Sequence, residues 1–152
     1  MINIKAQVSG RFRLKVYRSD GTLKKDTGWF DNLITNYGLN RMASSSDYLL
    51  YCHVGTNNTP PAYTDTSLAG FLHGAGANGS ATHPHSTSNP TYRSIKKVYR
   101  FDAGEATGNI SEVGISRKSS SGDLFSRALI VDSSDNPTTI TILSDESLDV
   151  EY

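Results

Sequence analysis

The chain has 152 residues, and its 15 basic side chains (Lys and Arg) balance 15 acidic ones (Asp and Glu). This length is typical of one domain with a core that needs no disulfide or metal. A net charge of zero favours neither nucleic acid nor an anionic membrane as a partner. The single cysteine, Cys52, excludes an internal disulfide, and its apolar surroundings (residues 48–54) predict a buried, inert thiol.

No apolar stretch approaches the roughly 20 residues that a membrane span needs. Residues 1–5 alternate like a strand and do not resemble a signal peptide. We therefore expect a soluble protein that is made in a cytoplasm and is not inserted into a membrane.

The N-terminal part of the chain alternates between apolar and polar residues, as a half-buried strand does. The apolar positions are Ile2, Ile4, Ala6 and Val8, followed after Gly10 by Phe12, Leu14 and Val16. An isolated glycine in such a pattern indicates a bulge or bend, so residues 2–18 are predicted to form one bent strand. Residues 19–22 are typical of a tight turn, and residues 23–28 of the return strand.

Residues 29–39 hold the only tryptophan and five further large apolar or aromatic side chains, which predicts a hydrophobic plug at one end of the core. A short helix is expected nearby. Residues 36–42 could form one or two turns, or Asp31 or Asn32 could cap a helix through Tyr37, with Gly38 ending it or allowing a close approach. Residues 48–54 are predicted to form a buried strand.

Residues 55–91 are rich in small and polar residues and are predicted to form one long irregular loop, with 74–80 mobile or ordered only against another subunit. Further strands are expected at 92–101, 110–115, 124–131, 138–143 and 148–152. The strand at 92–101 has no cleanly apolar face, which favours an edge or an interface. Together these strands predict an all-β fold: one domain (1–152) forming an antiparallel β-sandwich of the jelly-roll or immunoglobulin-like kind, with one short helix.

No catalytic constellation is visible, and we predict neither an enzyme nor a cofactor. The chain has no Gly-x-Ser-x-Gly elbow. The carboxylates at 145, 146, 149 and 151 favour a solvated or interface face over a glycosidase pair. His83 and His85 have i, i+2 spacing, so three copies around an axis could present six ring nitrogens to a metal. Two exposed histidines without a metal are favoured, because no group nearby is evident that would orient the rings.

Four basic residues between 93 and 100 (Arg93, Lys96, Lys97, Arg100) interleave with Tyr92, Tyr99 and Phe101. They could form a platform for single-stranded nucleic acid, but pairing with an acidic neighbouring strand is favoured at zero net charge. Residues 1–52 carry eight basic and four acidic groups, whereas 143–152 carry four acidic and no basic ones. Two solvated faces are the favoured interpretation, and the alternative is that copies stack basic end to acidic end.

Several segments, taken in order, resemble a pattern in small virion structural proteins of tailed bacteriophages. There it reads approximately N-L-I-T-x-x-G-L, then V-G-T/S-G-x-T-x-P, then D-T-x-L. The corresponding segments are 29–35, 37–39, 53–56, 59–60 and 65–68, and 124–130, 137–140 and 148–152 resemble the ending of the same proteins. The resemblance covers most of the chain outside 73–91. One departure is Asn57, where a glycine is common.

The resemblance implies a non-enzymatic structural component of the virion, in the tail or neck (collar), without nucleic acid as a partner. Such proteins assemble with copies of themselves, as a trimer or a hexamer-type ring, and with other virion proteins through loops and terminal strands. We expect interfaces in the 55–91 loop, the N-terminal strand and the acidic C-terminal strand. The candidate residues are Tyr63, Leu68, Phe71, Leu72, Tyr92, Arg93, Lys97, Asp149 and Glu151.

Two alternatives stay open. One is a head decoration protein on the capsid surface. The other is a carbohydrate-binding module that contacts a glycan of the host cell surface through Tyr48, Tyr51, Tyr63 and Tyr92. An esterase or glycosidase is the least favoured interpretation, because no acid–base pair is apparent.

Overall fold

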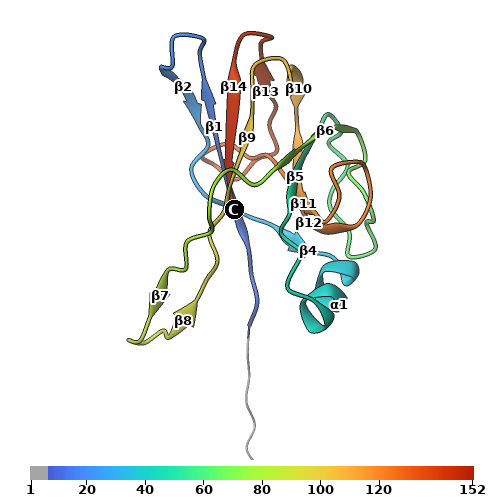
Figure 1. The fold of residues 1–152 in the computed structure, drawn as a ribbon. Helices are drawn as coiled ribbons and strands as arrows, with labels where there is room; N and C mark the ends of the chain where they lie inside the picture. The colour runs from blue at the N-terminus through green and yellow to red at the C-terminus, as the bar shows by residue number, and fades with distance from the viewer. Residues whose placement is uncertain (1–6) are drawn as a thin grey trace, which may run out of the picture.

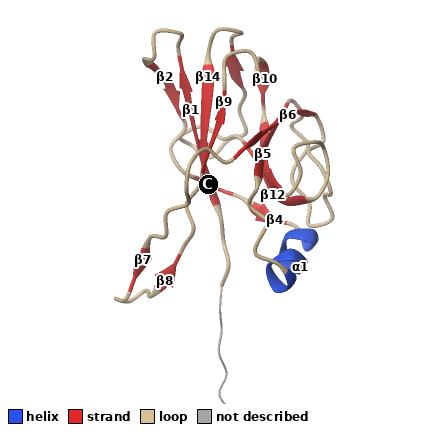
Figure 2. Ribbon diagram, in the orientation of Figure 1, coloured by secondary structure: helices blue, strands red, loops and turns tan. Residues whose placement is uncertain are grey.

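The structure is a computed structural model that describes residues 7–152, and it is mostly β-strand, with antiparallel sheets and one short helix (Figures 1 and 2). The predicted all-β class is therefore confirmed. No helix within the described residues is long and apolar enough to cross a membrane.

Two five-stranded sheets make up most of the fold. In the first, the order is β2 (Leu23–Asp26), β1 (Arg11–Tyr17), β14 (Ser147–Glu151) and β9 (Val98–Phe101), with β3 (Phe30–Asp31) paired to β1. In the second, the order is β4 (Leu33–Ile34), β12 (Leu124–Leu129), β11 (Glu112–Ser116), β5 (Tyr51–Gly55) and β6 (Phe71–Gly76). Two smaller pairs join β10 (Gly108–Ile110) to β13 (Ile140–Ile142), and β7 (His85–Ser86) to β8 (Tyr92–Arg93).

One hydrophobic core draws side chains from both large sheets. The predicted alternation in β1 is confirmed, because Phe12, Leu14 and Val16 are all fully buried. Val113 and Ile115 of β11 belong to the same cluster of buried residues. The part of the predicted N-terminal strand at residues 2–6 lies outside the described residues. Residues 7–10 are not in a strand, so the strand begins at Arg11, directly after the glycine that was predicted to bend it.

The predicted plug at residues 29–39 is only partly correct. Phe30 is 5% exposed and belongs to the core, whereas Trp29 is 40% exposed and Leu39 48%. The helix α1 (Asn36–Ser44) is capped by Thr35 and not by Asp31 or Asn32. Thr35 Oγ1 accepts a hydrogen bond from Gly38 N (3.0 Å) and donates to the carbonyl of Leu124, which ties the helix start to β12.

Gly38 does not end the helix. It is buried within α1, where a β-carbon would collide with the carbonyl oxygen of Phe125. The glycine therefore allows the close approach of helix and β12 that was the second of its two predicted roles.

The predicted loop at 55–91 and the predicted strand at 92–101 both need correction. The first contains β6, which pairs along β5 within the same chain, so residues 74–76 need no second subunit to be ordered. The second is divided into β8 and β9. The division separates a short outlying pair, β7–β8, from the strand that belongs to the first sheet.

Candidate functional site

A buried ion cluster joins β11, β12 and the segment that follows β5. The Arg127 side chain is 1% exposed and that of Glu112 is fully buried, and Arg127 Nη2 lies 2.7 Å from Glu112 Oε2. Arg127 Nη1 forms a second salt bridge, of 2.8 Å, to Asp65 Oδ2, and Nη2 donates to the carbonyl of Thr59. Burying these charges is tolerated because each is paired and hydrogen-bonded.

The cluster holds residues 56–70 against the second sheet. Glu112 accepts hydrogen bonds from Gly70 N (2.6 Å) and Ala69 N (3.2 Å), both at the end of that segment. Leu68 is 3% exposed and lies against Gly114 of β11. Residues 56–70 therefore cover one face of the sheet. Leu68 was predicted as an interface residue, but its side chain is buried between this segment and β11 of the same chain.

Four segments of the phage-like pattern meet at this cluster: 53–56, 59–60, 65–68 and 124–130. Gly55 has no room for a β-carbon, which would lie 2.5 Å from Glu112 Oε1. Asp65 supplies the second carboxylate and Leu68 the packing beside it. These residues of the pattern therefore have a structural role in this chain.

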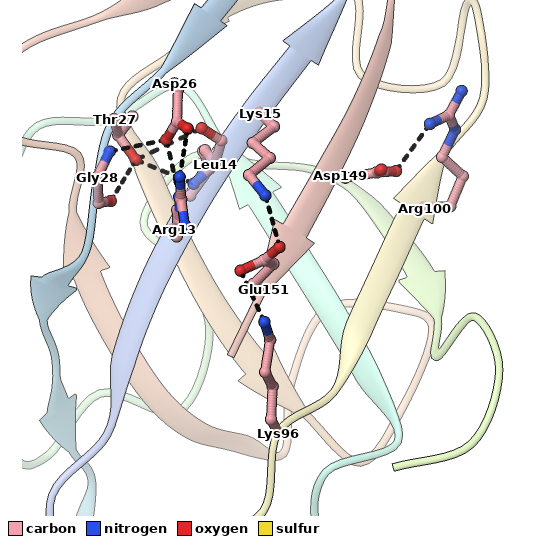
Figure 3. Close-up of polar contacts among 10 residues, drawn as sticks. All are labelled: Arg13, Leu14, Lys15, Asp26, Thr27, Gly28, Lys96, Arg100, Asp149 and Glu151. Carbon is pink, nitrogen blue, oxygen red and sulfur yellow. Dashed lines mark hydrogen bonds and ion pairs between the residues drawn. The ribbon is translucent and has the colours of Figure 1, made fainter. Parts of the chain in front are cut away.

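The outer face of the first sheet carries a compensated network of charges (Figure 3). The acidic residues of the inner strand β14 pair with basic residues of β1, of β9 and of the segment just before β9. Lys15 pairs with Glu151 at 2.8 Å, Lys96 with Glu151 at 3.1 Å, and Arg100 with Asp149 at 2.9 Å. The expected pairing of the basic strand with an acidic neighbour is confirmed for Arg100 and Lys96.

The charges on this face lower the pKa values of two carboxyl groups. The bidentate hydrogen bond from Arg13, helped by Gly28 N, lowers the pKa of Asp26 to about 2. Burial opposes ionisation of Glu151, but the hydrogen bond from Lys15 and the ion pair with Lys96 outweigh it and leave the Glu151 pKa below its ordinary value. The carboxylates predicted as interface residues thus already have partners within the chain.

The Trp29 ring contacts two cations. Arg11 Cζ is 5.8 Å and Lys96 Nζ 5.5 Å from the centre of the indole ring. Such cation–π contacts stabilise exposed sites by about 0.5–1 kcal/mol. These contacts explain why Trp29 can lie at the surface, although the many aromatic residues around it predicted a place in the core.

Residues 77–97 form a two-stranded ribbon that extends away from both sheets, here called the ribbon arm (Figures 1 and 2). Its strands are joined by Thr82 and Lys96, which exchange backbone hydrogen bonds of 2.9 and 2.8 Å, and by the β7–β8 pair. Between residues 77 and 95 only Ala81 and Ser86 are partly buried, and the others are exposed. Tyr92, Arg93, His83 and His85 are among the exposed residues of the arm.

Three turns meet at the opposite end of the molecule from the ribbon arm (Figure 1). They are residues 18–22, 102–105 and 143–146, here called the acidic end, because they carry five acidic residues and one basic residue. A shallow hollow between these turns is lined by Tyr17, Arg18, Ser19, Gly21, Arg100, Asp102, Ala103, Asp145 and Ser147. This end was not predicted from the sequence, because its three turns come from distant parts of the chain.

The remaining candidate residues are dispersed. Tyr63 is 62% and Leu72 38% exposed. Phe71 is half-buried with its ring edge-to-face against His53, and Lys97 Nζ donates to the carbonyl of Leu49 at 2.8 Å. Tyr99 and Phe101 are fully buried, which contradicts the alternative of an aromatic platform for single strands.

His83 and His85 both lie on the ribbon arm, and residues 7–152 contain no cluster of three or more metal-ligating side chains (His, Cys, Asp, Glu). Tyr48, one of the proposed glycan-stacking residues, instead stacks on Phe125 with ring centres 5.0 Å apart.

Cys52 is buried as predicted. Its neighbour His53 is also buried, and desolvation lowers the pKa of His53 even though its ring nitrogen bonds the Lys118 carbonyl.

No match to the chain was found among protein-family models, curated proteins or solved structures. The resemblance to phage virion proteins therefore stays a prediction from the sequence.

Proposed function

We propose that the chain is a non-enzymatic structural component of a tailed-bacteriophage particle, in its tail or neck, that works as a symmetric oligomer. The observation that carries this proposal is the ribbon arm. An exposed two-stranded segment that projects from the sheets is typical of a contact with a neighbouring subunit. Such a contact does not require a catalytic pocket.

The two five-stranded sheets fit this role as a rigid base. We propose that they pack as a β-sandwich, because the common core contains β1 and β14 of one and β5 and β11 of the other. The outer face of the first sheet has its charges paired. The buried ion cluster fixes residues 56–70 on the second. Neighbouring subunits would then meet through the projecting parts and not through the sheet faces.

A head decoration protein is the alternative that the exposed ribbon arm supports equally well. The number of copies per particle distinguishes a head decoration protein from a tail or neck protein. A glycan-binding module has a narrower basis. Trp29, Tyr63 and Tyr92 are exposed, but they are accompanied by no shared pocket within the described residues. Loss of glycan-array binding on Tyr63→Ala or Tyr92→Ala would favour that module.

Mass spectrometry of purified particles tests the proposal directly. We expect the chain to be present, in a multiple of three or six copies for a tail or neck ring. Hundreds of copies would indicate head decoration instead. Absence of the chain from intact particles would contradict a structural role in the virion.

A further inference from the structure

The ribbon arm exposes large apolar side chains that have no core of their own to pack into. Tyr92 is 50% and Ile95 42% exposed. A two-stranded ribbon alone is marginally stable in water, because it has no core to which both strands contribute. The arm therefore has the composition of a segment that becomes covered on association.

The acidic end exposes a complementary surface. Leu23, which directly follows one of its turns, is 50% exposed, and Leu143, the first residue of another, is 52% exposed. Asp102 is paired with Arg100 and Glu146 with Lys24, and Glu105 lies 3.8 Å from His73. Within residues 7–152 no ion pair is found for Asp20 or Asp145. Apolar side chains with unpaired acids at their border match a partner that is apolar and basic.

The ribbon arm is such a partner. Residues 66–101 contain no acidic residue, and Arg93 on the arm has no ion pair within the part of the chain that the structure describes. The arm and the acidic end lie at opposite ends of the molecule (Figure 1), so an arm cannot reach the acidic end of its own chain. The ribbon arm and the acidic end can therefore contact each other only between two copies of the chain.

We propose that the ribbon arm of one copy docks on the acidic end of a second copy, placing Arg93 beside Asp145 of its neighbour. The contact joins two different surfaces and is therefore head-to-tail, producing a ring if the rotation closes and a filament if it does not. This inference rests on the proposed function, to which it adds the partner and the two surfaces in contact.

A charge-reversal exchange tests the docking. Arg93→Glu and Asp145→Lys each place like charges in the contact, and we expect each to raise the dissociation constant of self-association at least about tenfold. The double variant Arg93→Glu/Asp145→Lys again brings opposite charges together at every contact, with their signs exchanged, and should associate as the natural chain does. Sedimentation velocity over a concentration series measures all three variants, and thermal melts check that they fold.

The matched controls are Arg117→Glu and Asp31→Lys, exposed charges outside both surfaces, which should leave association unchanged. An arm shortened by replacing residues 83–95 with Asn-Gly keeps the Thr82–Lys96 pairing and should be monomeric. Raising the salt concentration should weaken association of the natural chain.

Each outcome separates this inference from the proposed function. Oligomers whose size is unchanged by Arg93→Glu and by the shortened arm would overturn the docking and leave the virion role intact. A natural chain that stays monomeric at all concentrations would overturn self-docking, even if particles contain the protein. Only absence from particles would overturn the virion role itself.

Discussion

Arg127 and Glu112 form a 2.7 Å salt bridge between two side chains of which neither is more than 1% exposed. The pair is the centre of a cluster that also includes Asp65 and the backbone amides of residues 69 and 70. A charge so deeply buried is tolerated only while its partners are present, which makes the cluster a sensitive position in the fold.

Arg127→Met should destabilise the protein by about 3–5 kcal/mol, because it leaves Glu112 as an unpaired buried charge. Urea denaturation measures the loss. Arg13→Met, which removes the pair with Asp26 on the outer face, is the control and should cost much less, because those side chains are 31% and 25% exposed. Equal losses in the two variants would contradict the importance of the buried cluster.

Gly38→Ala should destabilise the protein by about 1–3 kcal/mol, although alanine is the better helix former. The added methyl group would collide with the carbonyl oxygen of Phe125 and push α1 away from β12. Asn40→Ala, at an exposed position of the same helix, is the matched control and should be neutral or slightly stabilising. Thermal unfolding of both variants decides whether close packing or helix propensity dominates.

Asp26 should make stability depend on pH in the acid range. Its folded-state pKa of about 2 lies below the ordinary value of 3.8, so the unfolded chain binds the proton more readily. The stabilisation is complete above about pH 5 and is lost as the pH falls toward about 2. Asp26→Asn should reduce this slope, because it removes the titrating carboxyl group. Urea midpoints at several pH values provide the comparison, and identical slopes for the natural chain and Asp26→Asn would refute it.

His53 should make stability depend on pH in a higher range than Asp26 does. Burial lowers its folded-state pKa, so protonation favours the unfolded chain, and stability should fall as the pH drops below about 6.5. His53→Phe removes the titrating group and keeps an aromatic ring beside Phe71. That variant should lose the pH dependence that sets in below about pH 6.5. A His53→Phe profile that still falls with pH would assign the effect to another group.

The strand pattern was predictable wherever alternation and turn residues agree. In β1 the apolar residues alternate strictly, and Gly21 follows Asp20 in a turn where its φ of 82° suits glycine. Trp29 was mispredicted because aromatic density does not record which face a side chain takes. Its two neighbouring cations are contributed by Arg11 and Lys96, which are far from each other in sequence.

The two central residues of the buried cluster stand out in the sequence. Glu112 is the only charged residue in the mostly apolar segment 110–115, and Arg127 is the only charged residue in the mostly apolar segment 124–131. Two opposite charges in neighbouring apolar strands indicate a buried pair. Asp65 gave no such indication, because its contact depends on the path of residues 56–70. The acidic end was equally inaccessible, since three separate turns form it.

The burial of Cys52 has a practical consequence for measuring the ribbon arm. Its thiol is fully buried, and desolvation raises the pKa of the thiol well above its usual range, so it should react very slowly with maleimides. Because the chain has only this cysteine, Ser88→Cys at the exposed tip of the arm would create one fast-reacting position. A fluorophore attached there would report arm rotation and neighbour distances without any cysteine having to be removed first.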